Sequence, residues 1–268
     1  MKTMRRLFLM ALMVMTSFIV GAGEIICEAK HFLGHVQGIT ADATGIYWSF
    51  YDTIVKTDYK GKTLLTTAIP RHAGDLYAAN GNIYVSVTYY DAKMAKDEGG
   101  TGWVFVYDAN LKLIKKVAIP DTPRPDGITF LNGKFYIAGD DFGKQAHNVN
   151  TISVYDSDFK FEKKINVDIG VPTNYGAQTL NAFDGKILAG FYAKSGKNSV
   201  FLELPELTPT GLFQSSVDVG MAVVPPEIAG NRKLVIVARL DGKPGDWGSK
   251  AIVYEMHGAI PLLADLEK

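Results

Sequence analysis

An internal repeat of apolar runs and tight glycine turns constrains the fold of this chain more than any other feature. Four copies align, at residues 39–50 (ITADATGIYWSF), 76–87 (LYAANGNIYVSV), 128–139 (ITFLNGKFYIAG) and 180–191 (LNAFDGKILAGF), and a degraded fifth copy covers residues 223–240. Each copy reads as two strands joined by a tight turn, which is typical of a β-hairpin. Repeats built only from strands predict a β-propeller.

Two further strands are expected after each hairpin, because alternating apolar and polar residues are typical of half-buried strands. The third strands are predicted at residues 53–59, 103–108, 151–156, 199–204 and 251–255, and the fourth at 63–69, 113–119, 161–167, 211–216 and 260–266. We therefore predict an all-β, five-bladed β-propeller with four antiparallel strands per blade, and a six-bladed ring is the alternative. Residues 24–32 are predicted to pair with the last blade and close the ring, which removes exposed sheet edges.

The first 23 residues have the composition of a secretory signal peptide. A basic start (Lys2, Arg5, Arg6) is followed by an apolar stretch at 7–20 and by small residues at 21–23. This order predicts export to the periplasm or the extracellular space, with cleavage near Ala22 or Gly23. An uncleaved membrane anchor is the alternative. After cleavage, residues 24–268 would form a single propeller domain without stable membrane insertion.

Charge and cysteine content narrow the range of partners. The 28 basic and 28 acidic residues balance to a formal net charge of 0. Binding to nucleic acid needs a basic surface, so the balance argues against such a partner. Cys27 is the only cysteine, so no disulfide can form within the chain, and a buried thiol is expected.

The loops at the two ends of the predicted propeller differ in length and polarity. The turns within each hairpin, such as Asn80-Gly81 and Asn132-Gly133, are minimal, whereas the loops between second and third strands are long. The links that lead into the next repeat share the end with the long loops, and they are rich in polar residues. Binding residues usually lie on loops of a rigid scaffold. The predicted ligand-binding residues are His35, Gln37, Arg71, His72, Asp75, Arg124, Asp126, Tyr175 and Gln178 on or beside the links, with Tyr51, Tyr90, His147, Arg239 and Trp247 in or near the loops.

These residue types allow several chemistries. His72 with Asp75 could act as an oriented base. Asp75 and Asp126, with amide oxygens beside them, would suit Ca²⁺, the only cofactor that the sequence suggests. Arg71 and Arg124 favour an anionic ligand instead. The sequence contains no G-x-S-x-G, H-E-x-x-H or P-loop motif and no cysteine-based zinc pattern, so the common hydrolase, metalloprotease and nucleotide motifs are absent.

The segment at residues 124–136 (RPDGITFLNGKFY), together with third strands that end in Val-Tyr-Asp, resembles the broad superfamily of NHL, gluconolactonase-like and YncE-like propellers. The resemblance covers most of the chain after the signal peptide, and its motifs are mainly structural. The gluconolactonase-like members hold a channel metal with Glu, Asn and Asp at the starts of their inner strands. Here only Asp75 and Asp126 offer comparable carboxylates.

Three functional hypotheses remain open at this point. The leading one is an exported propeller that binds a small polar ligand, a sugar or an organic acid, at its central channel. The second is a metal-assisted hydrolase or lyase that acts on a sugar or lactone, with His72 and Asp75 as catalytic residues. The third is a protein-interaction platform that uses the long loops.

Overall fold

The computed structural model describes residues 23–28, 34–70, 72–139, 147–193, 196–213, 219–239 and 250–255. These residues form antiparallel sheets, with two short helices between strands. The predicted signal peptide lies outside the described residues except for Gly23, as does the strand predicted at 260–266.

The first two repeats each form a four-stranded antiparallel sheet in sequence order. The first sheet consists of β2 (Val36–Asp42), β3 (Gly45–Phe50), β4 (Thr53–Thr57) and β5 (Thr63–Ala68). The second consists of β6 (Ala73–Ala79), β7 (Asn82–Thr88), β8 (Gly102–Asp108) and β9 (Leu113–Ala118). These sheets confirm the predicted four-stranded unit, with strand ends within a few residues of the expected ones.

The third and fourth repeats are joined into one seven-stranded sheet by a strand of 23 residues, β13 (Phe161–Phe183). Its first part pairs with β12, and its second part, from Thr173 onward, pairs with β14. The link between the repeats therefore belongs to one continuous strand, which is interrupted by positive φ angles at Gly170, Tyr175 and Gly176. The other strands of this sheet are β10 (Pro125–Leu131), β11 (Lys134–Gly139), β12 (His147–Asp156), β14 (Lys186–Ala193), β15 (Gly196–Glu203) and β16 (Thr208–Phe213).

The last sheet combines the two ends of the described chain. β17 (Met221–Val223), β18 (Leu234–Arg239) and β19 (Lys250–Glu255) come from the C-terminal region, and β1 (Gly23–Ile26) pairs with β19 as the edge strand. The predicted pairing of the segment before the first repeat with the last sheet is thus confirmed. Cys27 is buried beside this strand, as expected. The same segment also contacts the first sheet, where the backbone N–H of Glu28 donates to the carbonyl of Gly61 at 3.0 Å.

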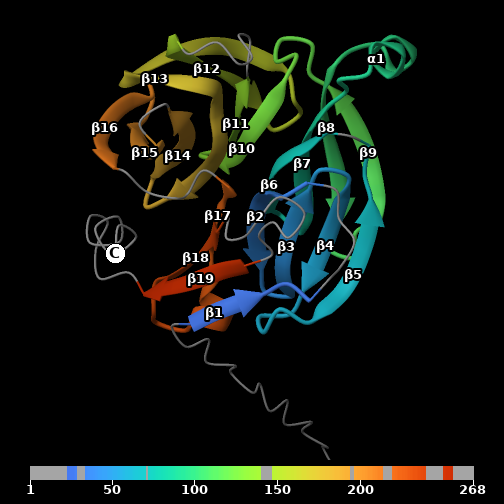
Figure 1. Cartoon of the computed structure of the whole chain (residues 1–268), viewed down its shortest axis with the longest axis vertical. Coiled ribbons are helices and arrows are strands. Elements are labelled where there is room, and N and C mark those ends of the chain that lie inside the picture. The colour runs from blue at the N-terminus through green and yellow to red at the C-terminus, as the bar shows by residue number, and fades with distance from the viewer. Residues whose placement is uncertain are drawn as a thin grey trace, which may run out of the picture.

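The sheets are arranged around a common centre (Figure 1). Their innermost strands contact one another in the order β2, β6, β10, β13 and β17, and β17 returns to β2. The approach is very close at Gly220, where an added Cβ would lie 2.6 Å from the backbone nitrogen of Ile39. Only a residue without a side chain allows β17 and β2 to meet at this distance, and the positive φ of 113° at Gly220 also favours glycine.

Hydrogen bonds from side chains join neighbouring sheets near the centre. The Ser49 hydroxyl on β3 donates to the carbonyl of Gly74 at 2.6 Å, and the Ser86 hydroxyl at the corresponding position of β7 donates to the carbonyl of Asp126. Buried apolar residues such as Ile39, Leu76 and Leu180 fill the space between the sheets. The core therefore lies between the sheets as well as within them.

The acidic residue that ends three of the third strands has a structural role. Each side chain accepts hydrogen bonds from two backbone N–H groups of the following turn, at distances between 2.8 and 3.0 Å; the residues are Asp58, Asp108 and Asp156. An aspartate that bonds to the backbone two residues ahead stabilises a tight turn. The Val-Tyr-Asp motif is therefore explained by turn formation.

The long loop after β7 contains a helix that the sequence pattern did not predict, α1 (Ala92–Glu98). Asp91 caps its N-terminus by accepting from the backbone N–H of Met94, and Gly99 ends it in the left-handed conformation. The helix buries none of its residues, so it has no apolar periodicity by which it could be recognised. A second short helix, α2 (Pro226–Ala229), lies between β17 and β18.

Candidate functional site

Four polar links enter the innermost strands from the same end of the molecule. They bring together the starts of β2, β6 and β10 and the second half of β13, which are neighbours around the centre. The predicted residues on these links that the structure describes are His35, Gln37, His72, Asp75, Arg124, Asp126, Tyr175 and Gln178. We call this group, with Tyr51 and Tyr90, the link-end cluster.

His72 is the buried centre of one half of the link-end cluster. Its ring makes an edge contact with Tyr51, with centroids 4.6 Å apart, and a tilted contact with Tyr90 at 5.6 Å. Burial, and to a smaller extent the nearby His35, lowers the pKa of His72 to about 4. The imidazole is therefore neutral near pH 7, and its Nδ1 has no hydrogen-bond partner. Tyr90 is 55% exposed, so this aromatic group extends from the buried His72 to the surface.

His35 and Gln37 lie next to each other at the start of β2. The amide nitrogen of Gln37 is 3.3 Å from Nδ1 of His35, and the same Nδ1 is 2.7 Å from the carbonyl of Val36. Because His35 also influences the pKa of His72, the two histidines belong to one polar group.

Asp75 lies fully buried at the centre of the ring. Its Oδ2 accepts from the backbone N–H of Leu180 on β13 at 3.0 Å and from that of Ile128 on β10 at 3.3 Å. Its Oδ1 has no partner and lies against Gly38, where an added Cβ would be 2.4 Å from it. Burial raises the pKa of Asp75 well above its usual value, although the backbone hydrogen bonds act in the opposite direction.

The His72–Asp75 pair expected from the sequence is not formed. Nδ1 of His72 and Oδ1 of Asp75 are both without partners, and Oδ2 of Asp75 is bonded to backbone groups. The spacing of the two residues along the chain suggested a pair. Asp75 on β6, however, turns inward to the backbone of other strands, while His72, just before β6, packs between tyrosines.

Asp126, Gln178 and Tyr175 form the other half of the link-end cluster. Asp126 is 7% exposed, and its Oδ2 accepts from the amide of Gln178 at 3.4 Å. The same amide donates to the carbonyl of Tyr175 at 3.0 Å, a residue with a positive φ of 64°. Asp126 also acts on the pKa of Asp75, so the two carboxyl groups are neighbours.

The remaining predicted residues join the cluster less clearly or lie outside the described residues. Arg124 is exposed. The guanidinium of Arg239 donates to the hydroxyl of Tyr254 at 2.6 Å, within the last sheet. His147 begins β12 and its backbone is opposite Thr173. Arg71 and Trp247 lie outside the described residues.

The suggested calcium site has only a partial set of ligands. Within the described ranges, no group of three or more His, Cys, Asp or Glu side chains gathers as a metal site would require. Asp75 and Asp126 are close to each other, but Oδ2 of Asp75 is already used by two backbone N–H groups. Gln178 supplies its N–H, rather than its oxygen, to Asp126.

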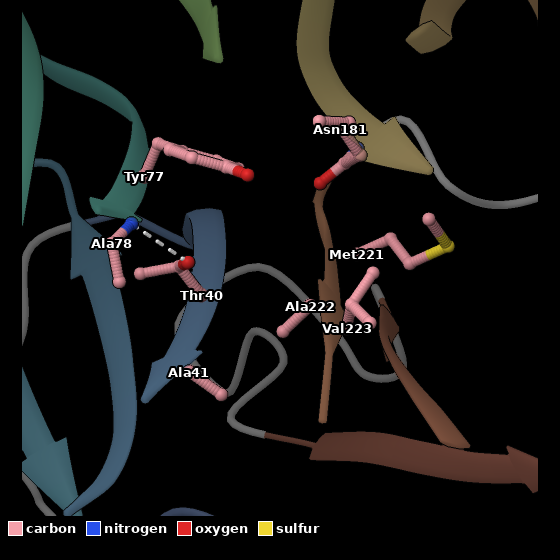
Figure 2. Close-up of a pocket in the computed structure, with 9 residues that line it drawn as sticks. Thr40, Ala41, Tyr77, Ala78, Asn181, Met221, Ala222 and Val223 are labelled. Carbon is pink, nitrogen blue, oxygen red and sulfur yellow. Dashed lines mark hydrogen bonds between the residues drawn. The ribbon is translucent and has the colours of Figure 1, made fainter. Parts of the chain in front are cut away.

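A cavity that the sequence did not predict opens at the opposite end of the ring (Figure 2). It has a volume of about 150 Å³ and is lined by the ends of β2, β6 and β13 and by β17. The hairpin turns at this end are short, and the candidate residues were predicted at the other end. The sequence did contain a signal for this cavity. The residue that follows the buried apolar position of an inner strand is polar at Thr40, Tyr77 and Asn181.

The fold and the ring of inner strands place this chain among the β-propellers, and solved structures support this class. The glutaminyl cyclase of Myxococcus xanthus aligns with a TM-score of 0.60 and 15% identity over 87% of this chain and 94% of that one. The β-xylosidase RS223 aligns at 0.55 with 11% identity, over 89% and 96% of the two chains. A GH43_1 enzyme from Xanthomonas citri aligns at 0.54 with 11% identity, over 90% and 92%. At such low identity these likenesses show the propeller fold alone.

The chain matches no family model and no curated protein. The resemblance to NHL and gluconolactonase-like propellers therefore stays a prediction. In the part of the chain that the structure describes, no helix has the length and apolar character needed to cross a membrane.

Proposed function

We propose that this chain is an exported five-bladed propeller that binds a small polar ligand, a sugar or an organic acid, at the link-end cluster. The observation that carries the proposal is the buried, neutral imidazole of His72 with an unpartnered Nδ1, set between two tyrosines. A buried polar atom without a partner costs free energy, and a ligand hydroxyl or carboxyl would satisfy it.

The way the strands are grouped supports the proposed blade count. β13 belongs to two four-stranded units because its two parts pair with different neighbours. Divided in this way, the strands would form five units, with β1 as a strand of the last one. Export rests on the composition of the first 23 residues. Mass spectrometry of the protein recovered outside the cytoplasm would test both the signal peptide and its cleavage near Ala22 or Gly23.

The residues of the link-end cluster would share the work of binding. Tyr51 and Tyr90 would stack on a sugar ring or cover an acid, as aromatic faces do in many ligand sites. Asp126, held by Gln178, would accept hydrogen bonds from hydroxyl groups, and the exposed Arg124 would pair with a carboxylate. We assign Asp75 to the support of the ring, because its oxygens face backbone groups and Gly38.

Isothermal titration with a panel of monosaccharides and small dicarboxylates would test the proposal, with and without EDTA. We expect a ligand whose binding survives EDTA and weakens at least about tenfold in His72→Gln, the loss expected for one hydrogen bond to a buried group. Asp158→Ala is the matched control, because Asp158 is exposed in a turn between third and fourth strands. Unchanged affinity in both His72→Gln and Gln178→Ala would refute the location of the site.

An enzymatic role is the second candidate, with the imidazole of His72, neutral near pH 7, as the proton acceptor. A neutral imidazole can accept a proton near pH 7, and the aligned structures include a glycosidase and a cyclase. Under this alternative, nitrophenyl glycosides or simple sugar lactones would be turned over, and His72→Gln would abolish turnover. Binding without turnover by the unmodified chain would leave the binding protein as the function.

A further inference from the structure

The cavity at the hairpin-turn end of the ring is separate from the link-end cluster. Inner strands run from the links to the hairpin turns, so Asp75 lies toward the link end of β6 and Tyr77 toward the turn end. Figure 2 shows Tyr77 and Asn181 directed into the space from β6 and β13, and Ala222 directed into it from β17. The cavity is therefore enclosed by side chains from three different sheets.

Small side chains at the turn ends of the inner strands leave this space open. An alanine follows the polar position in β2, β6 and β13, and these alanines line the cavity together with Ala222; they are Ala41, Ala78 and Ala182. A cavity of about 150 Å³ accommodates a molecule about the size of benzene.

The polar residues at this level of the ring are mostly paired with one another or with the backbone. Oγ1 of Thr40 accepts from the backbone N–H of Ala78 at 3.0 Å, and Oγ1 of Thr129 accepts from that of Ala182 at 2.9 Å. The two threonines occupy the same position in the first and third repeats, and each ties its strand to the next inner strand. The hydroxyl of Tyr77 is hydrogen-bonded to Thr129.

Asn181 occupies the corresponding position of the fourth repeat and is the exception. Its side chain is only 4% exposed, and its oxygen, Oδ1, is directed into the cavity (Figure 2). Its Nδ2 faces the protein interior instead, where it is buried. In the part of the chain that the structure describes, no group donates a hydrogen bond to Oδ1. Buried polar groups are nearly always paired, so an unpaired acceptor that faces a cavity marks a place for a donor.

The lining also restricts the charge of this donor. Every residue around the cavity is uncharged, and burying an ion without an opposite charge is strongly unfavourable. Aliphatic amines are cations near pH 7, whereas an alcohol combines a neutral donor with a hydrocarbon part. The methyl groups of the alanines provide the apolar surface that such a hydrocarbon part needs.

We propose that this cavity is a binding site for a small neutral alcohol, whose hydroxyl group donates a hydrogen bond to Oδ1 of Asn181. The hydrocarbon part of the alcohol packs against Ala78 and Ala222. Val223, which is 41% exposed, borders the cavity and makes this side of it accessible from solvent. The site is independent of the ligand proposed for the link-end cluster.

Cyclopentanol and cyclopentanone provide a matched pair of probes, because they share a ring and an oxygen and differ in the proton that the hydroxyl group can donate. The readout is the side-chain amide signal of Asn181 in the chain labelled with ¹⁵N at asparagine, which is identified by its absence in Asn181→Leu. We expect cyclopentanol to shift this signal in a saturable way, because the amide group responds when Oδ1 accepts a hydrogen bond. The signal of Asn110, which is exposed in the turn between β8 and β9, should not move.

Three variants test the site by a different route, and they guard against a failure of any one to fold. Asn181→Ala and Asn181→Leu remove the acceptor, and Ala222→Leu fills the space while it keeps Asn181. In titrations that follow the signals of the alcohol, we expect cyclopentanol to bind each variant at least about tenfold more weakly than the unmodified chain. Ala92→Leu makes the same change as Ala222→Leu on the exposed helix α1, and it should bind cyclopentanol as the unmodified chain does.

The absence of an Asn181 shift with cyclopentanol would overturn the proposal and leave the cavity to water. Equally tight binding of cyclopentanone would show that the hydroxyl proton plays no part, and it would overturn the proposal as well. Unchanged affinity for cyclopentanol in the Asn181 variants and in Ala222→Leu would place the alcohol elsewhere on the protein.

Discussion

Removal of the Asp75 side chain should destabilise the protein more than most substitutions of a single aspartate. Asp75→Ala leaves the backbone N–H groups of Ile128 and Leu180 buried without an acceptor. Each unsatisfied buried donor costs about 1–3 kcal/mol, so the free energy of unfolding should fall by about 2–6 kcal/mol. For a chain of this size, each 1 kcal/mol lowers the melting temperature by about 2–4 °C.

Urea unfolding followed by tryptophan fluorescence, to which the buried Trp48 contributes, would measure this loss. Asp75→Asn keeps a carbonyl acceptor and should lose less than Asp75→Ala, and Asp97→Ala on the exposed helix α1 serves as the control. Asp75 has a raised pKa in the folded state, so its protonation favours folding at low pH, and this contribution disappears as pH rises through the folded pKa. The Asn variant should therefore gain stability relative to the unmodified chain as pH rises. The reasoning fails if Asp75→Ala changes the unfolding free energy by less than about 0.5 kcal/mol, or if the Ala and Asn variants lose equal stability.

Three further predictions concern ring closure, the contact between sheets and pH. Ile25→Ala in β1 should lower the unfolding free energy by about 2–5 kcal/mol, because Ile25 is buried where β1 completes the last sheet. Urea unfolding would measure this loss, and a value below about 0.5 kcal/mol would contradict closure by this strand. Lys56→Ala should lower the unfolding free energy by about 1–3 kcal/mol, since the buried ammonium group donates to the carbonyl of Ala109 in the neighbouring sheet at 2.8 Å. Melting curves of the variant and the unmodified chain would measure this loss, and equal melting temperatures would show that the contact does not stabilise the fold. The pKa of His72 is about 4 in the folded protein, against an ordinary value of 6.5. Above pH 6.5 the neutral imidazole therefore adds about 3 kcal/mol to the free energy of unfolding, and this contribution is lost as pH falls through 4. His72→Gln should flatten this part of a curve of stability against pH, and an unchanged curve would show that the imidazole is not buried.

Much of the fold could be predicted because its determinants are local. Asn-Gly and Asp-Gly turns need a positive φ that few residues adopt, and Asn80, Asn132 and Asp184 adopt it. The strand positions followed from alternation and turn spacing for the same reason. The continuity of β13 through residues 169–178 could not be read in this way, because a polar link and an extended strand have similar local sequences.

The sequence predicted which residues belong to the candidate site better than it predicted the contacts between them. The sequence placed His35, His72, Asp126 and Gln178 at one end of the ring, since the direction of each inner strand follows from the order of the repeat. It also suggested that His72 and Asp75 form a pair, which the structure does not contain. Side chains three residues apart on a strand point to different faces, and a bulge between Ala73 and Leu76 alters their directions further.

The sequence by itself determined the repeated four-stranded unit, the tight turns and the end of the ring at which polar links gather, because each depends on neighbours along the chain. Only the tertiary structure decided that Asp75 bonds to β10 and β13, that β1 completes the sheet of β19, and that Nδ2 of Asn181 is buried without a hydrogen-bond partner. Those outcomes depend on contacts between segments far apart in the chain, such as Asp75 and Leu180, which are 105 residues apart, and Gly23 and Val253. They are set by how closely the inner strands pack around the centre, which no local pattern of residues records.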